Sequence, residues 1–264
     1  MTHRLQGLSR LVHRRARRGF SMIDVLVSMA VIALLMGLLL PSLAIVRETA
    51  RRVVCASNVR QIGLGLAMYG DDFREFLPPT AYLHVATGPK WEQMMVLRMT
   101  PLEGPTYQTN SAYWDGLGML FWHDYLNAPR IFYCPSHKGE HPYERYTSVL
   151  NRNANPLNAD IVGNYQYRGV GPNGSNRLWR IEPSFSALAT DGLRSVDDFS
   201  HRTGANVLRA DLSLFWYSDT GGLMTANFER MGAASSGDER SNAVYDAWEI
   251  LDGGSAASSG DPGN

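Results

Sequence analysis

The sequence is poor in cysteine and lacks the short motifs of several enzyme classes. Only Cys55 and Cys134 occur among its 264 residues, which is too few for a disulfide framework. No G-x-S-x-G, Walker A or H-E-x-x-H pattern is present, so the sequence gives no sign of a serine hydrolase, a P-loop nucleotide site or a zinc protease of those types. We therefore expect no catalytic residues, and we expect that the chain is not an enzyme.

Acidic residues are missing from positions 1–19, a stretch that holds six arginines. Such a basic leader stays on the cytoplasmic side of a membrane. Without these arginines, the rest of the chain has 19 basic and 25 acidic residues, a net charge of −6. An acidic chain of this kind argues against nucleic acid as the main partner, because phosphate binding depends on lysine and arginine.

Charge is nearly absent from residues 20–46, where Asp24 is the single charged residue and fifteen positions are Phe, Leu, Ile or Val. A helix of this length can cross a hydrocarbon core about 30 Å thick. At about −0.3 to −0.6 kcal/mol each, the apolar residues outweigh one carboxylate, which costs at most about 3.5 kcal/mol. The run predicts a transmembrane helix whose following chain lies outside the cytoplasm, and its one carboxylate is a candidate for function.

The junction between leader and apolar run resembles a known processing signal. An ordinary secretory signal is cut behind its apolar region, after small residues of the A-x-A type, and no such pattern follows the run here. Gly19, Phe20 and Asp24 instead match the class III signal of type IV pilins and type II secretion pseudopilins, and Pro41 falls where many of these helices have a proline. The resemblance implies cleavage after Gly19 by a prepilin peptidase, N-methylation of Phe20 and retention of the apolar helix.

Asp24 stands where this family usually has glutamate, and its side chain is one methylene shorter. Cleavage leaves a positive amine on Phe20 inside or near the lipid. The carboxylate of one subunit can neutralise the amine of its neighbour, because an unpaired charge in a low dielectric is costly. Asp24 is thus the expected assembly residue. The expected partners are other pilin or pseudopilin subunits, an inner-membrane assembly platform and membrane lipid. The alternative is a plain signal anchor with an incidental aspartate.

Residues 47–72 are predicted to continue the helix as an amphipathic segment, with a bend at Pro41 because proline breaks a backbone hydrogen bond to the preceding turn. Apolar residues recur at intervals of three and four, which places them on one helical face. The members of this stripe are Val46, Ala50, Val53, Cys55, Val59, Ile62, Leu66 and Tyr69.

Two later elements are similar to those of a large bacterial group of pilin-like proteins. Residues 55–64 resemble its C-x-N-(L/V)-(R/K)-Q-(I/L)-G-L element, with two residues instead of one between Cys55 and Asn58. His201 and Asp211 have the spacing of its H-x9-D-G element, but Leu212 replaces the glycine. Strands are expected at 206–210 and 213–217, and a glycine between them would suit a tight turn with positive φ. Leu212 should therefore strain or lengthen that turn.

The predicted fold class is α+β, with the long N-terminal transmembrane-plus-amphipathic helix packed on an antiparallel β-sheet head, as in pilins. The head is assigned to residues 73–231, where turn signals are dense. Residues 232–264 are rich in Gly, Ser and Ala and are expected to be mostly disordered. Trp248, Ile250 and Leu251 interrupt that tail as a short segment that can dock on the head.

No metal or other cofactor is expected. Cys134, His137 and His141 form a C-x2-H-x3-H run, but the histidines lie in a polar loop and a closed zinc site needs a fourth ligand. In some major pseudopilins a C-terminal loop holds calcium. The candidate acids for that role in this chain are Asp211, Asp219 and Asp238, and their spacing fits no calcium template.

The roles of the remaining cysteine and histidine candidates stay open. Outside the cytoplasm Cys55 and Cys134 can form one disulfide, but sequence alone does not bring their Cα atoms within the required distance of about 7 Å. His201 is either a ligand or acid–base group, or the donor of a fixed hydrogen bond, and we expect the latter.

These observations predict a structural subunit of a type IV pilus-like or type II secretion pseudopilus filament. The expected location is the bacterial inner membrane, with a single span and a periplasmic head, and after assembly a periplasmic or cell-surface filament. The alternative is a membrane-anchored extracytoplasmic binding protein or enzyme whose anchor is never cut.

Overall fold

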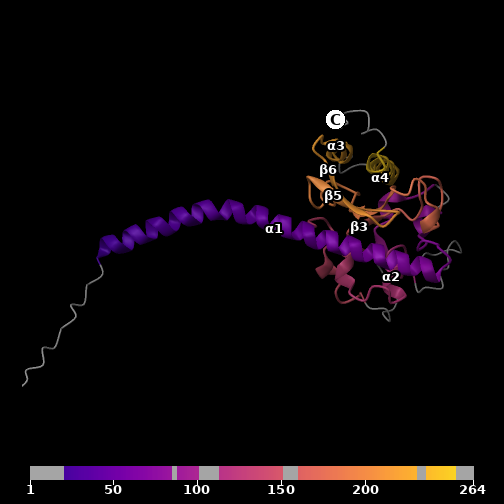
Figure 1. Ribbon diagram of the computed structural model, residues 1–264, viewed down its shortest axis with the longest axis horizontal. Coiled ribbons are helices and arrows are strands. Elements are labelled where there is room, and N and C mark those ends of the chain that lie inside the picture. Colours follow the sequence, from indigo (N-terminus) through magenta and orange to yellow (C-terminus); the bar gives the residue numbers. More distant parts are fainter. Residues whose placement is uncertain (1–20, 85–87, 101–112, 151–159, 231–235, 254–264) are drawn as a thin grey trace, which may run out of the picture. The chain divides into compact units, whose positions relative to one another are not determined.

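The computed structural model describes residues 21–84, 88–100, 113–150, 160–230 and 236–253. The chain divides into two compact units, residues 1–46 and 47–264. Helix α1, Met22–Asp72, supplies the described part of the first unit and enters the second (Figure 1). The predicted continuous helix is therefore confirmed. It ends at Asp72, the second residue of the acidic pair Asp71-Asp72 that follows the apolar pattern.

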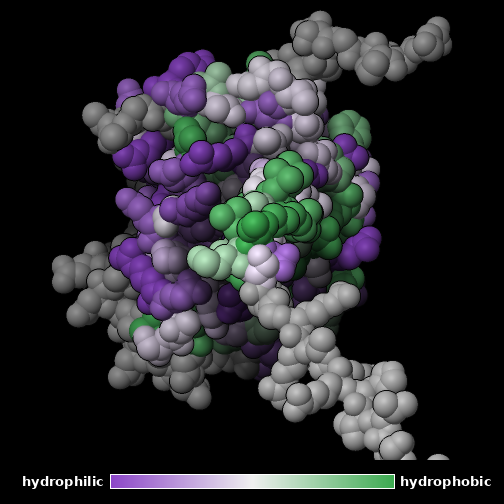
Figure 2. All heavy atoms as spheres, turned by 90° about the vertical axis from the view of Figure 1, so that its left-hand side faces the viewer, coloured by the Kyte–Doolittle hydropathy of each residue, from purple (hydrophilic) through white to green (hydrophobic). Residues whose placement is uncertain are grey.

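In the first unit, the apolar side chains of α1 are exposed. Figure 2 views this helix end-on and shows a group of green, hydrophobic atoms in the foreground. An 18-residue window of this helix has a mean hydropathy of 2.6 and none of it is buried. Among the described residues, α1 is the one helix long and apolar enough to cross a membrane. Pro41 lies inside the helix, and the bend expected there stays a prediction.

In the second unit, α1 presents a narrow buried stripe to the head. The buried apolar members are Cys55, Val59, Ile62, Leu66 and Tyr69, as the spacing predicts. Val53 belongs to the predicted stripe but is 66% exposed, so burial along the stripe begins only at Cys55.

The head contains two antiparallel sheets. The larger sheet has the order β3-β4-β5-β6, and its strands are β3 Tyr165–Tyr167, β4 Ala187–Asp191, β5 Gly204–Arg209 and β6 Leu214–Ser218. The smaller sheet pairs β1 Val96–Arg98 with β2 Ile161–Val162. The α+β architecture, with a long helix packed on antiparallel sheets, is thus the predicted one.

The larger sheet is covered on both faces. Successive residues of a strand point to opposite faces, and Leu208 packs in the core that includes α1, whereas Val207 packs in a second core. The remaining α-helices are α2 Gly118–Trp122, α3 Leu223–Glu229 and α4 Gly237–Leu251. The 3-10 helices are Ala81–Leu83, Trp91–Gln93, Pro129–Phe132, Tyr143–Arg145 and Leu178–Arg180. Helices α3 and α4 contribute to the second core, on the side of the sheet away from α1 (Figure 1).

The β5–β6 hairpin agrees with the sequence to within two residues at each strand end. Leu212 adopts φ 64°, in the left-handed region that glycine favours. Asp211 stabilises the same turn, since its Oδ1 accepts a hydrogen bond of 2.8 Å from the Ser213 backbone N–H. The strain expected from a leucine at this position is therefore present as a positive φ.

The prediction of a disordered tail is wrong for residues 237–251, which form helix α4. Ser236 and Glu239 cap its N-terminus reciprocally in a capping box, an arrangement that satisfies two of the backbone N–H groups left free at a helix start. Ala243, Val244 and Trp248 lie on its buried face. The predicted docking of the segment around Trp248 is confirmed, but as part of a fifteen-residue helix.

Candidate functional site

The predicted processing site is only partly described. Gly19 and Phe20 lie outside the described residues. Asp24 lies in the first turn of α1, and its Oδ2 accepts a hydrogen bond of 3.2 Å from the Ser21 backbone N–H. A carboxylate at this position interacts favourably with the positive end of the helix dipole. This local contact leaves the carboxylate exposed, and its predicted role in assembly stays a prediction.

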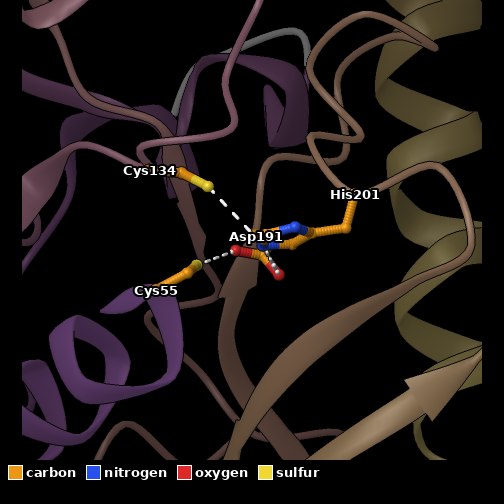
Figure 3. Close-up of side chains that lie close together, drawn as sticks. All are labelled: Cys55, Cys134, Asp191 and His201. Atoms are coloured by element: carbon orange, nitrogen blue, oxygen red, sulfur yellow. Dashed lines mark hydrogen bonds and ion pairs between the residues drawn. The ribbon is translucent and has the colours of Figure 1, made fainter. Parts of the chain in front are cut away.

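Four buried polar side chains lie close together as a cluster in the head (Figure 3). Cys55 comes from α1, Cys134 from the turn after the 3-10 helix Pro129–Phe132, Asp191 from the end of β4, and His201 from the loop before β5. One possible ligand atom from each residue lies within 4.8 Å of all the others. The fold thus brings together four groups that are spread over almost 150 positions of the chain.

The contacts within the cluster are short. The Cys55 thiol donates to Asp191 Oδ1 at 2.6 Å, and Cys134 Sγ lies 3.6 Å from His201 Nε2. His201 Nε2 also lies 3.8 Å from Asp191 Oδ2. The backbone N–H of Asn206 donates to the same Oδ2 at 2.6 Å, which fixes the orientation of the carboxylate.

The outer edge of the cluster fixes the orientation of His201. Its Nδ1 lies 2.7 Å from Glu48 Oε1. Because an ionised carboxylate can only accept, Nδ1 is the donor and carries the proton. The Ser136 hydroxyl donates to the same carboxylate, at 2.9 Å and 3.0 Å to its two oxygens. His201 therefore makes the fixed hydrogen bond that the sequence predicts, and it also faces two potential ligands with Nε2.

Burial and mutual contact shift the pKa values of all four groups. Burial raises the pKa of Cys55 well above its usual range and that of Asp191 to about 7. The neighbouring Cys55 thiol and, after it, His201 lower the pKa of Cys134 to about 5. Burial lowers the pKa of His201, but the contacts with Cys134 and Asp191 outweigh it and raise this pKa to about 9. The charged form that the cluster favours is thus a Cys134 thiolate beside a His201 imidazolium.

The C-x2-H-x3-H run is not brought together as a site. The one group of possible metal ligands found among the described residues contains Cys134 but neither His137 nor His141. His141 Nδ1 instead lies 2.6 Å from the Tyr146 hydroxyl, and His137 Nε2 lies 3.8 Å from Asp198 Oδ1. The histidine that contacts Cys134 is therefore His201, from a different part of the chain.

The candidate calcium ligands each have separate partners. Asp211 belongs to the β5–β6 turn. Asp219 accepts the backbone N–H groups of Met224 and Thr225 at the start of α3, at 3.0 Å and 2.9 Å. Asp238 pairs with Lys90. His201 and Asp211, which share a sequence element, consequently serve different parts of the fold.

Cys55 and Cys134 are both free, buried thiols in the structure. Their sulfur atoms lie within 4.8 Å of one another, so the fold has already brought them close. The disulfide that the sequence permits stays a prediction.

A cavity of about 300 Å³ lies beside the cluster. Cys134, Asn58 and His137 are among its lining residues. Cys134 is the one member of the cluster among its lining residues, so the cavity reaches the edge of the cluster.

Sequence reasoning missed Asp191 altogether. It occurs in an Asp-Gly pair that is read as a turn signal, although it closes strand β4 and is 0% exposed. The one available signal is that the preceding residues, 187–190, are small and apolar enough to form a buried strand. That signal locates a strand but does not indicate which cysteines its end will meet.

Comparison with protein families decides the class of the chain. Residues 14–40 match the family model described as the prokaryotic N-terminal methylation motif. Residues 45–193, more than half of the chain, match the model described as protein of unknown function (DUF1559). The chain belongs to the DUF1559 family. The searches of curated proteins and of solved structures give no match.

The matched DUF1559 region includes Cys55, Cys134 and Asp191 and ends before His201. The methylation motif in front of it implies a pilin-like protein processed by prepilin peptidase. Together with the apolar half of α1, it indicates a membrane-anchored DUF1559 protein with an extracytoplasmic head.

Proposed function

We propose that this DUF1559 protein is a structural subunit of a filament of the type IV pilus or type II secretion pseudopilus class. The observation that carries the proposal is the combination of a prepilin-type signal with a long apolar helix. Up to Val46, no part of the described chain covers the apolar side chains of this helix. In lipid these side chains are solvated. In a filament the corresponding helices of neighbouring subunits cover them.

Assembly follows from the chemistry of the cut end. Cleavage after Gly19 would leave the amine of Phe20 close in sequence to Asp24. Stacking of subunits offsets the cost of that amine, because the carboxylate of one chain pairs with the amine of the next. The partners of this step are other pilin-like subunits, the inner-membrane assembly platform and the lipid that releases the helix.

We further propose that the chain is not an enzyme. Cys134, His201 and Glu48 do form a row of thiol, imidazole and carboxylate, the order used by cysteine nucleophiles. This row favours a second candidate function, a membrane-anchored enzyme with an uncut anchor. Cys134 is 5% exposed, however, and a second thiol and Asp191 crowd it, which supports a structural role instead.

The processing step is tested by the N-terminus of the mature protein. The full-length chain is expressed in cells with and without a prepilin peptidase, and the purified protein is analysed by mass spectrometry. We expect an N-methylated Phe20 only when the peptidase is present. Gly19→Ala should accumulate as the precursor, whereas the control Gly7→Ala in the same leader should mature normally.

The filament role is tested separately by shearing cells and labelling the released material with immunogold. We expect label along filaments for the wild-type chain and none for Gly19→Ala. A wild-type protein that retains Met1 in peptidase-positive cells, and that never enters sheared material, would favour the anchored enzyme or binding protein.

A further inference from the structure

The buried cluster of Cys55, Cys134, Asp191 and His201 has the composition of a metal site. It offers two sulfurs, one imidazole nitrogen and one carboxylate oxygen, all within 4.8 Å of one another. Zn²⁺ takes four ligands of these types in a tetrahedron, whose edges are about 3.3–3.8 Å when the bonds are about 2.0–2.3 Å. We propose that Cys55, Cys134, Asp191 and His201 bind one zinc ion. Small side-chain shifts around a common centre suffice to form this tetrahedron.

Hydrogen bonds with neighbouring residues orient two of the proposed ligands, His201 and Asp191, as is typical of metal sites. Histidine ligands usually donate their second ring N–H to a carboxylate or carbonyl, which fixes the tautomer and directs the other nitrogen to the metal. His201 Nδ1 makes this bond to Glu48 at 2.7 Å, and Nε2 faces Cys134 at 3.6 Å. Asp191 is held in the same way, because Asn206 donates its backbone N–H to Oδ2.

Burial makes a cation favourable here. The four residues are between 0% and 5% exposed. Burying two thiolates and a carboxylate away from water is energetically unfavourable unless a positive charge lies beside them. A divalent ion supplies that charge. On binding, the proton of the Cys55 thiol and the Nε2 proton of the His201 imidazolium pass to the solvent, because the ligands bind in their deprotonated forms.

The proposed site is structural, since all four coordination positions come from the protein and no open position is left for a substrate. Its ligands link helix α1, the end of β4 and two loops. Such a link makes the metal-binding free energy part of the folding free energy of the head. The zinc ion would thus fix α1 to the sheet.

The test measures zinc in the full-length protein purified in detergent and kept reduced. The protein is loaded with zinc, passed over a desalting column and analysed for metal per chain. We expect one zinc per wild-type chain and a large loss of zinc in Cys134→Ser and in His201→Gln. The control His141→Gln belongs to the C-x2-H-x3-H run but bonds to Tyr146, so it should keep one zinc.

The cobalt spectrum of the wild-type chain provides a measurement that does not depend on the folding of a variant. Co²⁺ in the reduced wild-type chain should give a thiolate-to-cobalt charge-transfer band together with the visible bands of a tetrahedral ion. Glu48→Gln should keep both bands but weaken the affinity by about 10–100-fold, as the loss of a carboxylate behind a histidine ligand does. Glu48 is a positioning residue in this site.

The proposal is overturned if the reduced wild-type chain retains no zinc and gives no cobalt–thiolate band. That outcome would leave a disulfide or a hydrogen-bonded cluster as the role of the two thiols. Zinc that is retained by His201→Gln and lost in His141→Gln would also overturn it, because the ligands would then belong to the run around Cys134.

Discussion

At the scale of the single residue, Asp115 is an acid placed where its charge is unfavourable. It is 1% exposed, and burial raises its pKa to about 7. Its carboxylate accepts the Thr80 hydroxyl at 2.7 Å and the Ala81 backbone N–H at 2.8 Å. These bonds offset part of the desolvation cost and fix the chain that follows α1.

The raised pKa predicts that Asp115 makes the head less stable as the pH rises. An aspartate in the unfolded chain has a pKa of about 3.9, so between pH 4 and 7 the folded state binds more protons at this site. The free energy of unfolding therefore falls across that window, by up to about 4 kcal/mol at this site. Asp115→Asn should reduce this slope, as measured by urea unfolding at a series of pH values.

The control for Asp115→Asn is Asp71→Asn, at an exposed carboxylate. It should leave the slope of stability against pH as in the wild type. Equal slopes for Asp115→Asn and the wild type would show that Asp115 is not a source of the pH dependence.

At the scale of the element, helix α2 sits against strand β1 with no room for a side chain. A Cβ at Gly118 would lie 1.9 Å from the backbone oxygen of Leu97 and 2.7 Å from its carbonyl carbon. Both atoms belong to backbone, so α2 or β1 would have to move. Gly118 thus sets the distance between two elements that carry core residues of the head.

Gly118→Ala should therefore destabilise the head by about 3 kcal/mol or more, at the upper end of overpacking costs. Gly221→Ala is the matched control, because its Cβ would meet nothing closer than Leu223 Cγ at 3.9 Å. We expect the control to stay within about 0.5 kcal/mol of the wild type. Thermal unfolding of the two variants in detergent compares them, and equal midpoints would contradict the packing argument.

Trp248 is the largest side chain that helix α4 buries. Trp248 is 0% exposed, and the Arg168 guanidinium lies 5.6 Å from its ring centre. Beyond the helix end, Asp252 pairs with Arg168 and accepts the Ala187 backbone N–H at 2.7 Å. The C-terminal helix is therefore fixed to the sheet through both apolar and charged contacts.

Trp248→Ala should cost about 3–5 kcal/mol, the range for removal of a buried tryptophan side chain. Glu249→Ala, on the exposed side of the same helix, should cost less than about 1 kcal/mol. Limited proteolysis followed by mass spectrometry should show early loss of residues after the β-sheet in Trp248→Ala alone. A protease-resistant C-terminus in that variant would mean that other contacts hold α4.

At the scale of the whole molecule, we propose that α1 assembles with other subunits through its apolar half and the Asp24 carboxylate at its start. Asp24→Ala should still be cut by the peptidase but should enter filaments poorly, because the amine of a neighbouring subunit loses its counter-charge. Removal of one partner of a buried pair costs about 3–5 kcal/mol. The measurement is the fraction of processed subunit in sheared filaments.

Two further variants sharpen the Asp24 test. Asp24→Glu should restore assembly, since it keeps the charge that such pairing needs. Ser28→Ala should assemble as the wild type does, because the Ser28 hydroxyl donates to the Val25 carbonyl of its own helix. Wild-type incorporation of Asp24→Ala would remove Asp24 from the assembly mechanism.

The sequence by itself determined the features of this protein that are local or periodic. The basic leader, the apolar run and the processing signal are each contiguous, and the buried stripe of α1 follows the helical repeat from Cys55 to Tyr69. The hairpin with a strained Leu212 is also local, because a turn type depends on a few neighbouring residues.

Only the tertiary structure decided which distant residues meet. Cys55, Cys134, Asp191 and His201 come from a helix, a loop, a strand end and another loop. Hydrophobic periodicity shows which face of an element is buried but not which element lies against it. The same limit explains α4, whose glycine- and serine-rich flanks suggest disorder, while Trp248 packs in a core with residues that are distant in the sequence, such as Ala187 and Val207.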